Sequence, residues 1–470
     1  MIKILKSIIV LFLLLIASLQ SEAQEVHSFS LKEAQIYALE HNYDVINALT
    51  DIEIARQKVK ETTAIGLPQI NASLSYNNYL DIPTTLMPDF MTPIILQTTD
   101  QYYDVELRPG VEYPTEVQYF ETQFGTQHNA TWGATLNQLI FNGQYIVGLQ
   151  ASRAFLSLSE AGLEKSQIEI KDAIAQAYFP VIILQENKMV FDSTLASIDN
   201  MLYETTEYHN AGFLEDTDVD QLELLKADML ATITNIDNQL LIAQNMLKYL
   251  MGIKANDIIV VTDKLENLIE EVNREFMLNS AFDHNNHIDF MMLKNQEKIA
   301  VLNIKLNKSE YLPSLNAFYS YQENAMRNDF NLFDFTKSWY PTQVLGLQMD
   351  IPIWSSGSRK YKIQQAKLEL EKVKVQEEQL KQGLSLRVRT VKAEFNNAYL
   401  IYLNKQMGLT NSERIYKKTK VKYREGISSS LDFSQTYNQY LNTQIAFLAA
   451  TLDLLSKKSE LEKELTKVGY

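Results

Sequence analysis

Residues 67–76 read LPQINASLSY, and residues 312–321 read LPSLNAFYSY. Six of the ten positions are identical, at a constant offset of 245 residues. Each copy opens with Leu-Pro and then alternates apolar with polar side chains. This pattern is typical of a strand that begins just after a proline has ended a helix. A chain that repeats such a joint so far apart is built from two similar halves.

Three further pairs of segments support the duplication and keep the same order along the chain. ALEHNYDV (38–45) resembles AFDHNNHI (281–288), GATLNQLIFNG (133–143) resembles GLQMDIPIWSSG (346–357), and GFLEDTDVDQ (212–221) resembles GISSSLDFSQ (426–435). A period of roughly 210–245 residues is far too long for a solenoid. We therefore divide the chain into a first repeat at 24–252, a connecting segment at 253–280 that includes a short strand, and a second repeat at 281–470.

Each repeat is expected to begin with a helix followed by two strands. Ser30-Leu-Lys-Glu33 is a capping box that starts a helix, which should continue to about Ile65 and stop before Pro68. Strict alternation then predicts strands with one apolar and one polar face. Their expected ranges are about 69–80 and 129–141 in the first repeat, and about 313–322 and 343–354 in the second.

Two long helices should follow each strand pair. Apolar residues recur at spacings of three and four over 222–250, 380–402 and 441–455, as in coiled-coil seams. One helix should run from about 144 to Gly212, with Pro180 kinking or breaking it, and its counterpart from 357 to Gly426. The expected fold is all-α, with duplicated helical hairpins that have tips near 212 and 426, plus four inserted strands.

The composition narrows the class of protein. Two early lysines, an apolar run at 8–17 and Ser21-Glu22-Ala23 predict a secretory signal peptide at 1–23. The 470 residues include no Cys, which excludes disulfides and thiolate metal sites, and the formal charge of −15 argues against nucleic acid as a partner. No later segment has 18 consecutive apolar residues, so a helical inner-membrane protein is not expected.

Apolar and polar residues alternate along these strands. The strands of an outer-membrane barrel show the same alternation, because one face contacts lipid and the other contacts water. Aromatic residues gather in or beside them, as in the girdles at membrane interfaces; the main ones are Trp132, Trp339, Trp354, Tyr76 and Tyr321. Four strands cannot close a barrel, so the chain should oligomerise, giving eight strands in a dimer or twelve in a trimer. The long acidic loop at 84–127 should then face the cell exterior and favour cations.

These features together resemble the TolC-like outer-membrane efflux protein family. The resemblance rests on the duplicated order of elements, on the run that ends in Leu-Pro before each first strand, and on the spacing G-x5-D-x2-Q. It implies a homotrimer with a 12-stranded barrel in outer-membrane lipid and a helical tunnel in the periplasm. It also implies a passive duct gated at its helical tip and opened by a periplasmic adaptor with an inner-membrane RND or ABC transporter.

The resemblance assigns roles to residues at the two helix–helix turns. The turns Gly212-Phe213 and Gly426-Ile427 would be the tip where the adaptor docks. Asp432 would form a constriction ring, Gln435 stands where a second aspartate is expected, Tyr423 would face Asp218, and Thr217 lacks its arginine partner because Ser428 stands there. Ordinary capping is the alternative: the glycines can end helices and the aspartates can start them.

A channel is not the only interpretation of these features. A secreted coiled-coil structural or adhesive protein would share the helical seams but would not need aromatic girdles on amphipathic strands. His284-x-x-His287 has metal-like spacing, yet its counterpart in the first repeat has only His41, so a helix terminus is the simpler interpretation. No nucleophile elbow, zinc helix motif or phosphate loop is present. We expect no enzyme activity, no metal and no cofactor.

Overall fold

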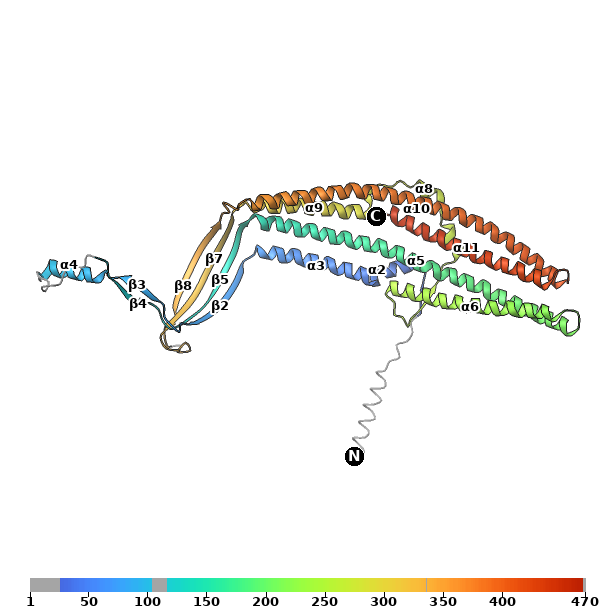
Figure 1. Cartoon of the computed structure of the whole chain (residues 1–470), viewed down its shortest axis with the longest axis horizontal. Helices are drawn as coiled ribbons and strands as arrows, with labels where there is room; N and C mark the ends of the chain where they lie inside the picture. Colours follow the sequence, from blue (N-terminus) through green and yellow to red (C-terminus); the bar gives the residue numbers. More distant parts are fainter. Residues whose placement is uncertain (1–25, 104–115, 335, 468–470) are drawn as a thin grey trace, which may run out of the picture. The chain divides into compact units, whose positions relative to one another are not determined.

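The computed structural model describes residues 26–103, 116–334 and 336–467, so the expected signal peptide and part of the acidic loop lie outside the described residues (Figure 1). The chain separates into two compact units. Unit 1 consists of Met1–Lys58, Ala151–Val301 and Ala366–Tyr470, and unit 2 of Val59–Gln150 and Leu302–Gln365. Each unit takes segments from both sequence repeats. The repeat boundaries themselves remain a prediction.

Unit 2 contains a four-stranded antiparallel sheet in the order β2-β5-β7-β8 (Figure 1). The strands are β2 (Gln69–Asn78), β5 (His128–Asn142), β7 (Ser314–Arg327) and β8 (Tyr340–Asp350). Strand β8 ends at Asp350 rather than near 354, because Pro352 has no N–H to donate to a ladder. The backbone then turns through Ser356 and Gly357, at φ 49° and 87°, before the next helix.

The register places like side chains on the same face of this sheet. Ala72 of β2 pairs with Ala134 of β5, which pairs with Tyr321 of β7. On the opposite face, the hydroxyls of Thr135 and Ser320 lie 3.1 Å apart. The alternation expected from the sequence is therefore shared by all four strands, and it gives the sheet one apolar and one polar face.

Two glycines allow neighbouring strands to approach. A Cβ atom on Gly133 would lie 2.5 Å from the backbone oxygen of Tyr321, and a Cβ atom on Gly346 would lie 2.5 Å from the ring of Phe318. Phe318 interrupts the polar face in the sequence because its ring covers the glycine opposite it, as aromatic residues do in other sheets.

We expect Gly133→Ala to destabilise the sheet by about 1–3 kcal/mol, since the obstructing atom belongs to the backbone and cannot swing away. The thermal unfolding midpoint of the purified protein measures this change. Gly148→Ala is the matched control, because nothing lies within 4 Å of that Cβ, and it should stabilise a helix by about 0.5–1 kcal/mol. Equal midpoints for the two variants would contradict the argument.

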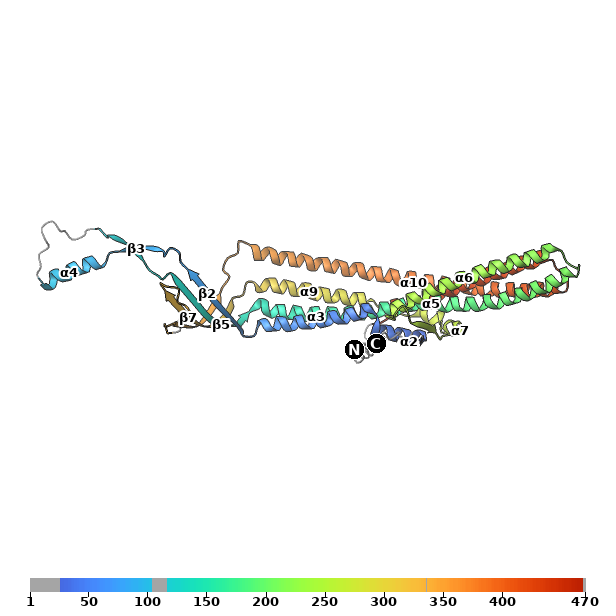
Figure 2. The ribbon, with the colours of Figure 1, turned by 90° about the horizontal axis from the view of Figure 1, so that it is seen from below.

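The segment between β2 and β5 is more ordered than the expected loop. It contains a two-stranded hairpin of β3 (Thr84–Pro88) and β4 (Tyr119–Gln123), and the helix α4 (Met91–Tyr103) (Figure 2). The carboxylate of Asp89 accepts hydrogen bonds from the backbone N–H groups of Met91 and Thr92 at the start of α4. At least one acidic residue of this segment therefore starts a helix.

The helices include one break that the sequence analysis did not predict. The helix expected over 30–65 is divided into α2 (Leu31–His41) and α3 (Tyr43–Ile65). The side chain of Asn42 accepts a hydrogen bond from the backbone N–H of Asp44 at 2.8 Å and donates one to the carbonyl oxygen of Leu250 at 2.7 Å. Asn42 ends α2, where its backbone N–H donates to the carbonyl oxygen of Ala38, and its side-chain oxygen caps α3.

Of the kink or break expected at Pro180, the break is absent. Helix α5 runs without interruption over Gly143–Asn210, with Pro180 inside it. The residues on both sides of it, including Tyr178, Phe179 and Val181, are buried in the main hydrophobic core of unit 1. Packing on this scale outweighs the single hydrogen bond that a proline removes.

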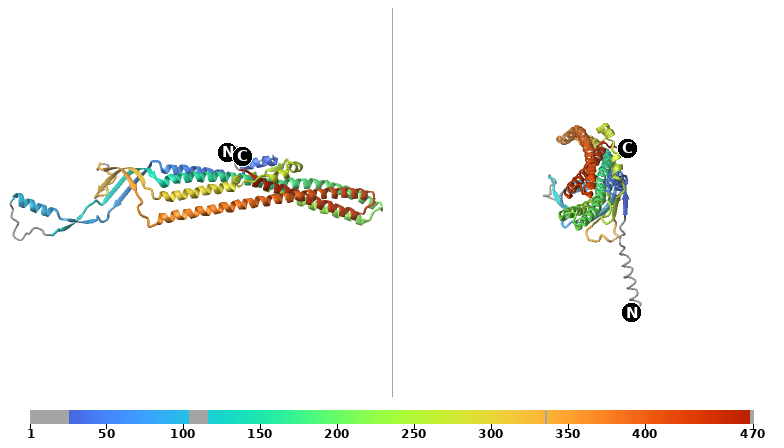
Figure 3. Two further views of the ribbon diagram at one scale, coloured as in Figure 1. Left: turned by 90° about the horizontal axis from the view of Figure 1, so that it is seen from above. Right: turned by 90° about the vertical axis from the view of Figure 1, so that its right-hand side faces the viewer.

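The rest of unit 1 is built from two helical hairpins and a small sheet. The hairpins are α5 with α6 (Asp216–Met251), and α10 (Ser358–Arg424) with α11 (Ser430–Leu465). Their turns lie side by side at one end of the unit (Figures 2 and 3). Strand β1 (Val26–Phe29) pairs in parallel with β6 (Ile258–Val261), followed by α7 (Leu265–Glu270), α8 (Arg274–Asn279) and, after residues 284–286, α9 (Ile288–Ser309). No helix in the described ranges has both the length and the apolar composition needed to cross a membrane.

Candidate functional site

The two helix–helix turns of unit 1 have the same backbone construction. After α5, the N–H of Gly212 donates to the carbonyl oxygen of His209 and the N–H of Phe213 donates to that of Tyr208, both at 2.9 Å. After α10, Gly426 and Ile427 repeat these bonds. Both glycines are left-handed, with φ of 79° and 67°. These are Schellman motifs, in which glycine supplies the positive φ that other residues resist.

Each turn continues into a capped helix. The hydroxyl oxygen of Ser429 accepts from the N–H of Asp432 at 3.1 Å, and the Asp432 carboxylate accepts in return from the Ser429 hydroxyl at 2.8 Å. In the other turn, the carboxylate of Asp218 accepts from the N–H of Glu215. Both aspartates therefore occupy the third helical position of a capping box. The capping interpretation describes their contacts within one protomer, and a gating role for them remains a proposal.

Both turns expose an apolar side chain at their apex. Phe213 is 77% exposed and Ile427 is 75% exposed. The residue at this position of a Schellman motif usually packs against its own helix. Two unpacked apolar residues at matching positions are suited to contact another molecule.

The turns are joined by three side-chain contacts between α5 and α10. The hydroxyl of Tyr423 lies 3.0 Å from the hydroxyl of Thr205. The guanidinium of Arg424 lies 3.2 Å from the carboxylate of Glu204, and the ammonium of Lys420 donates to the hydroxyl of Ser197. We call these three pairs the α5–α10 latch.

Burial shifts the pKa values of two residues of the α5–α10 latch. Burial raises the pKa of the Tyr423 hydroxyl, and the nearby charge of Asp218 adds to this effect, while the hydrogen bond with Thr205 opposes it. Burial also lowers the pKa of Lys420, with Arg424 as the second cause. Tyr423 thus lies near Asp218, as the resemblance implies, but its direct hydrogen bond is to Thr205.

The other two predicted gate residues lie at the surface. Thr217 donates its backbone N–H to Asp216 at 2.8 Å. Gln435 lines an open hollow of about 690 Å³ between α10 and α11, which is rich in amide side chains. Neither residue takes part in the α5–α10 latch among the described contacts.

An aromatic cluster lies directly behind the latch. Phe433 and Tyr437 have no exposed surface. The ring of Phe433 lies 5.4 Å from that of Tyr423 and 6.0 Å from that of Tyr416. The Tyr437 hydroxyl faces the sulfur of Met229 in the first hairpin at 3.8 Å. The cluster therefore holds the two hairpins together with aromatic packing.

The sequence analysis found Tyr423 but missed its partners. Ser197, Glu204 and Thr205 belong to no recognisable motif, and they lie more than 200 residues from the bases and the tyrosine that they meet. Phe433 and Tyr437 are four residues apart on α11, and Tyr416 and Tyr423 are seven residues apart on α10. That spacing was the available signal for the cluster.

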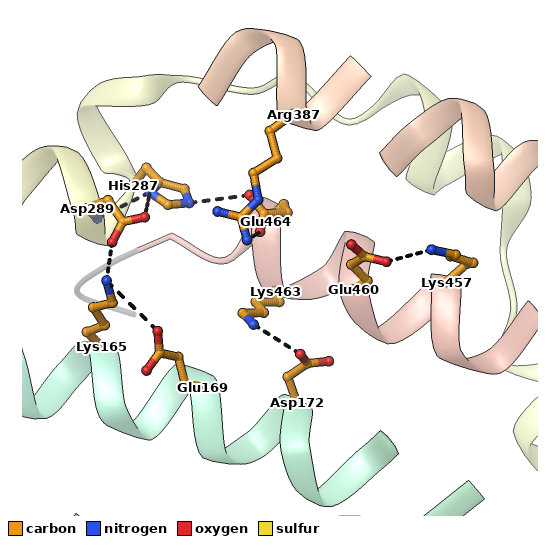
Figure 4. A network of polar contacts seen from close by, with 10 residues as sticks. All are labelled: Lys165, Glu169, Asp172, His287, Asp289, Arg387, Lys457, Glu460, Lys463 and Glu464. Atoms are coloured by element: carbon orange, nitrogen blue, oxygen red, sulfur yellow. Dashed lines mark hydrogen bonds and ion pairs between the residues drawn. The ribbon is translucent and has the colours of Figure 1, made fainter. Parts of the chain in front are cut away.

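A second group of polar contacts lies where α9, α10 and α11 meet α5 (Figure 4). Arg387 of α10 lies 2.8 Å from Glu464 of α11, whose side chain is only 2% exposed. The other oxygen of Glu464 has no hydrogen-bond partner, and the nearest ring nitrogen of His287 is 3.7 Å away. Lys165 of α5 contacts Asp289 at 2.8 Å. The buried carboxylate of Glu464 therefore depends on Arg387 for its charge balance.

The two histidines that suggested a metal do not converge. His284 contacts Asp283 and the ring of Phe290, whereas His287 contacts Glu464 and Asp289. Within the described residues, no group of three or more His, Asp or Glu side chains is placed to hold a metal ion.

In unit 2, the predicted interfacial aromatics lie in the strands of the sheet or beside them. Trp132 of β5 is 45% exposed, and its ring meets that of Tyr321 edge-on at 6.0 Å. Tyr76 shares a 2.9 Å hydrogen bond with His128. Trp354 is strongly exposed after the end of β8, and Trp339 is half-buried just before its start. The apolar face of the sheet is also exposed, and the outermost strands β2 and β8 each have a free edge.

Comparison with known proteins gives a match of part of the chain to one family model, and a shared fold. A family model described as outer membrane efflux protein matches residues 285–465, and no curated protein matches the chain. The fold is similar to that of the Campylobacter jejuni CmeC outer membrane channel, at 17% identity and a TM-score of 0.64 over 93% of this chain and 85% of that chain. It is also similar to the Vibrio cholerae outer membrane protein VceC, at 15% identity and a TM-score of 0.63 over 93% of this chain and 96% of that chain. The open state of the Neisseria gonorrhoeae MtrE outer membrane channel is similar at 17% identity and a TM-score of 0.67, over 93% of this chain and 88% of that chain.

Proposed function

We propose that this chain, whose residues 285–465 match a family model described as outer membrane efflux protein, is a trimeric exit duct of the outer membrane with a gated helical end. The coarse assignment, an outer-membrane efflux channel, is supported by this match and by the fold shared with solved outer membrane channels. The trimer, the gate and the partners are the parts that we propose.

The exposed sheet of unit 2 is the main observation in favour of a membrane barrel. Its apolar face includes Leu74 and Leu345, which are 79% and 81% exposed. Its edge strands β2 and β8 have unpaired backbone groups that lipid cannot satisfy. Pairing β8 of one copy with β2 of the next would satisfy both edges and bury none of the apolar face. Three copies would give twelve strands, as the family resemblance implies.

The helical hairpins of unit 1 would form the periplasmic end of the duct. We propose that the apices Gly212-Phe213 and Gly426-Ile427 dock a periplasmic adaptor, since both expose an apolar side chain. The adaptor would couple the duct to an inner-membrane RND or ABC transporter. The α5–α10 latch would hold each protomer closed until the adaptor binds, and a ring of Asp432 carboxylates would select cations.

Fractionation and electrophysiology test this proposal. The protein should be extracted from the outer membrane only by detergent, run as a trimer by native mass spectrometry, and conduct ions in planar bilayers. A soluble monomer would contradict the channel and would favour the alternative, a secreted coiled-coil structural or adhesive protein.

Removing the Tyr423–Thr205 contact should weaken closure of the tip. In Thr205→Val/Tyr423→Phe, one hydrogen bond between the hairpins is lost, worth about 0.5–1.5 kcal/mol per protomer. We therefore expect a higher open probability in single-channel recordings. Thr206→Val is the matched control, because its hydroxyl bonds only to the carbonyl oxygen of Leu202 in its own helix. Indistinguishable recordings from the two variants would exclude the latch.

Neutralising the proposed ring should change ion selectivity. Asp432→Asn should reduce the preference for cations, since three carboxylates would be lost at one constriction. The reversal potential in a salt gradient measures this. Asp453→Asn, on the same helix, serves as the control. Unchanged selectivity and gating in Asp432→Asn would leave capping as the role of this residue.

A further inference from the structure

An open cavity of about 620 Å³ lies in unit 2 where the sheet meets the long helices. Its wall includes the end of β8 and the start of α10, and Figure 1 shows the joint where this strand leads into this helix. The charged side chains in the wall are those of Arg359 and Lys362 in α10, Glu310 after α9, and Asp350 in β8. In the proposed duct, the barrel gives way to the periplasmic helices at this joint, so these charges would lie near lipid headgroups.

Two of the bases at the start of α10 have no acidic partner. Lys362 is paired with Glu310 at 2.9 Å. Arg359 donates to the backbone oxygen of Pro352 at 3.1 Å, which leaves most of its five N–H donors available. In the described part of the chain, no carboxylate is paired with Arg359 or with Lys360, which is exposed. An anion can therefore bind here without displacing an ion pair.

The position of these bases is unfavourable for the helix itself. Arg359, Lys360 and Lys362 lie within the first five residues of α10, a helix of 67 residues with no acid in its first turn. The N-terminus of a helix carries a partial positive charge, which repels Lys and Arg. Among the described contacts, no side chain caps this end of α10. An anion bound beside the bases would remove the repulsion.

The corresponding joint in the first repeat has no such bases. The segment 133–143 resembles 346–357, and it also leads from a strand into a long helix. There the side chain of Asn142 caps α5 by accepting a hydrogen bond from the backbone N–H of Tyr145 at 3.0 Å. The first Lys or Arg of α5 is Arg153. A strand-to-helix joint of this kind therefore does not require the bases that the second repeat has.

Exposed apolar residues precede the bases along the chain. Leu347 and Met349 in β8 are exposed, and so are Ile353 and Trp354 beyond the end of the strand. Tryptophan is favoured at the level of the headgroups, where a membrane meets water. The chain thus passes from an apolar strand to a tryptophan and then to bases. A lipid leaflet has the same order of acyl chain, interface and headgroup.

We propose that this joint binds the phosphate of an anionic phospholipid in the periplasmic leaflet, with Arg359 and Lys360 as its ligands. Both side chains are suited to phosphate, and the planar fork of arginine can contact two phosphate oxygens at once. The acyl chains would lie along the apolar face of β8, beside Leu347 and Met349. The inference rests on the proposed membrane barrel and adds a specific lipid site to it.

Lipid binding by the purified protein in detergent tests the proposal. Native mass spectrometry counts the lipids that stay bound as phosphatidylglycerol, which is anionic, or phosphatidylcholine, which is zwitterionic, is added. The wild type should prefer phosphatidylglycerol. In Arg359→Gln/Lys360→Gln the affinity for this lipid should fall roughly tenfold or more, since two bases near the headgroup are removed. Equal affinity in this variant and the wild type would overturn the site.

The thermal unfolding midpoint separates a ligand from a structural residue. Without lipid, Lys360→Gln should unfold at the same temperature as the wild type or a higher one, because it removes a base from the start of a helix. With phosphatidylglycerol, the midpoint of the wild type should rise more than that of Lys360→Gln. A variant that is less stable without lipid and gains as much from lipid as the wild type would overturn the role of Lys360.

Controls distinguish this site from general effects of charge and from other anions. Lys372→Gln/Lys374→Gln removes two exposed lysines farther along the same helix and should bind phosphatidylglycerol as the wild type does. Inorganic phosphate that stabilises the wild type as strongly as the lipid does, at equal concentration, would assign the cavity to a soluble anion and overturn the lipid site. A trimeric, conducting wild type without a preference for phosphatidylglycerol would overturn this inference alone. A soluble monomer would instead overturn the proposed function.

Discussion

Arg387→Ala is expected to lower the free energy of unfolding of the protomer by about 3–5 kcal/mol, because it leaves a buried carboxylate without its cation. The carboxylate is that of Glu464, of which 2% is exposed and which has one oxygen on Arg387 and the other without a hydrogen bond. His287 is the nearest remaining partner, but its nitrogen is 3.7 Å away. The thermal unfolding midpoint in detergent measures the change.

Two further variants identify the cause. Arg389→Ala removes an exposed arginine two residues away on the same helix and should change the midpoint little. Arg387→Ala/Glu464→Gln removes the orphaned charge and should recover much of the lost stability. If the double variant is no more stable than Arg387→Ala, the cost arises from lost packing of the arginine stem and not from the buried charge.

Phe433→Ala is expected to have the largest effect on the tip, with a loss of about 3–5 kcal/mol. Phe433 is fully buried, and its ring contacts those of Tyr416, Tyr423 and Tyr437. The cavity would lie directly behind the Tyr423–Thr205 hydrogen bond. We therefore expect both a lower unfolding midpoint and a channel that opens without its partners.

The exposed neighbour of Phe433 provides the control. Leu431 is 52% exposed in the first turn of α11, so Leu431→Ala should affect stability and open probability only slightly. Phe433→Leu should fall between wild type and Phe433→Ala, because it leaves a smaller cavity. A Phe433→Ala channel that is destabilised but remains closed would separate the aromatic cluster from the gate.

The sequence predicted the strands well because one physical pattern governs them. Alternation from Ile70 to Tyr76 is imposed by a sheet that has different surroundings on its two faces, and the register of all four strands agrees with it. The Schellman glycines and capping boxes were also visible, since they depend on residues close together in the chain. The resemblance to the outer-membrane efflux family rested on the duplicated order of elements, on the Leu-Pro run and on the G-x5-D-x2-Q spacing, and the family model matches residues 285–465.

Features that depend on distant packing were harder to predict. The seam expected in α11 included Ile445, which is 44% exposed, while Gln444 beside it is buried. Helical spacing alone does not say which of two adjacent residues faces the partner helix. The contribution of Asn42 was missed for a similar reason, since its amide bonds to Leu250 across the fold. The partners of Tyr423 could be found only once α5 and α10 were placed side by side.

The pairing of β5 with β7 determines when the sheet can form during folding. His128 of the first repeat lies opposite Arg327 of the second, so this central ladder closes a loop that includes a complete helical hairpin. Contacts between residues this far apart form slowly, whereas the helical hairpins rely on local contacts. We expect the helical hairpins to fold first. Until β5 and β7 pair, the β2–β5 and β7–β8 pairs would each remain isolated, with two unpaired edges. A newly exported chain would therefore be most prone to aggregation before its second half joins the first.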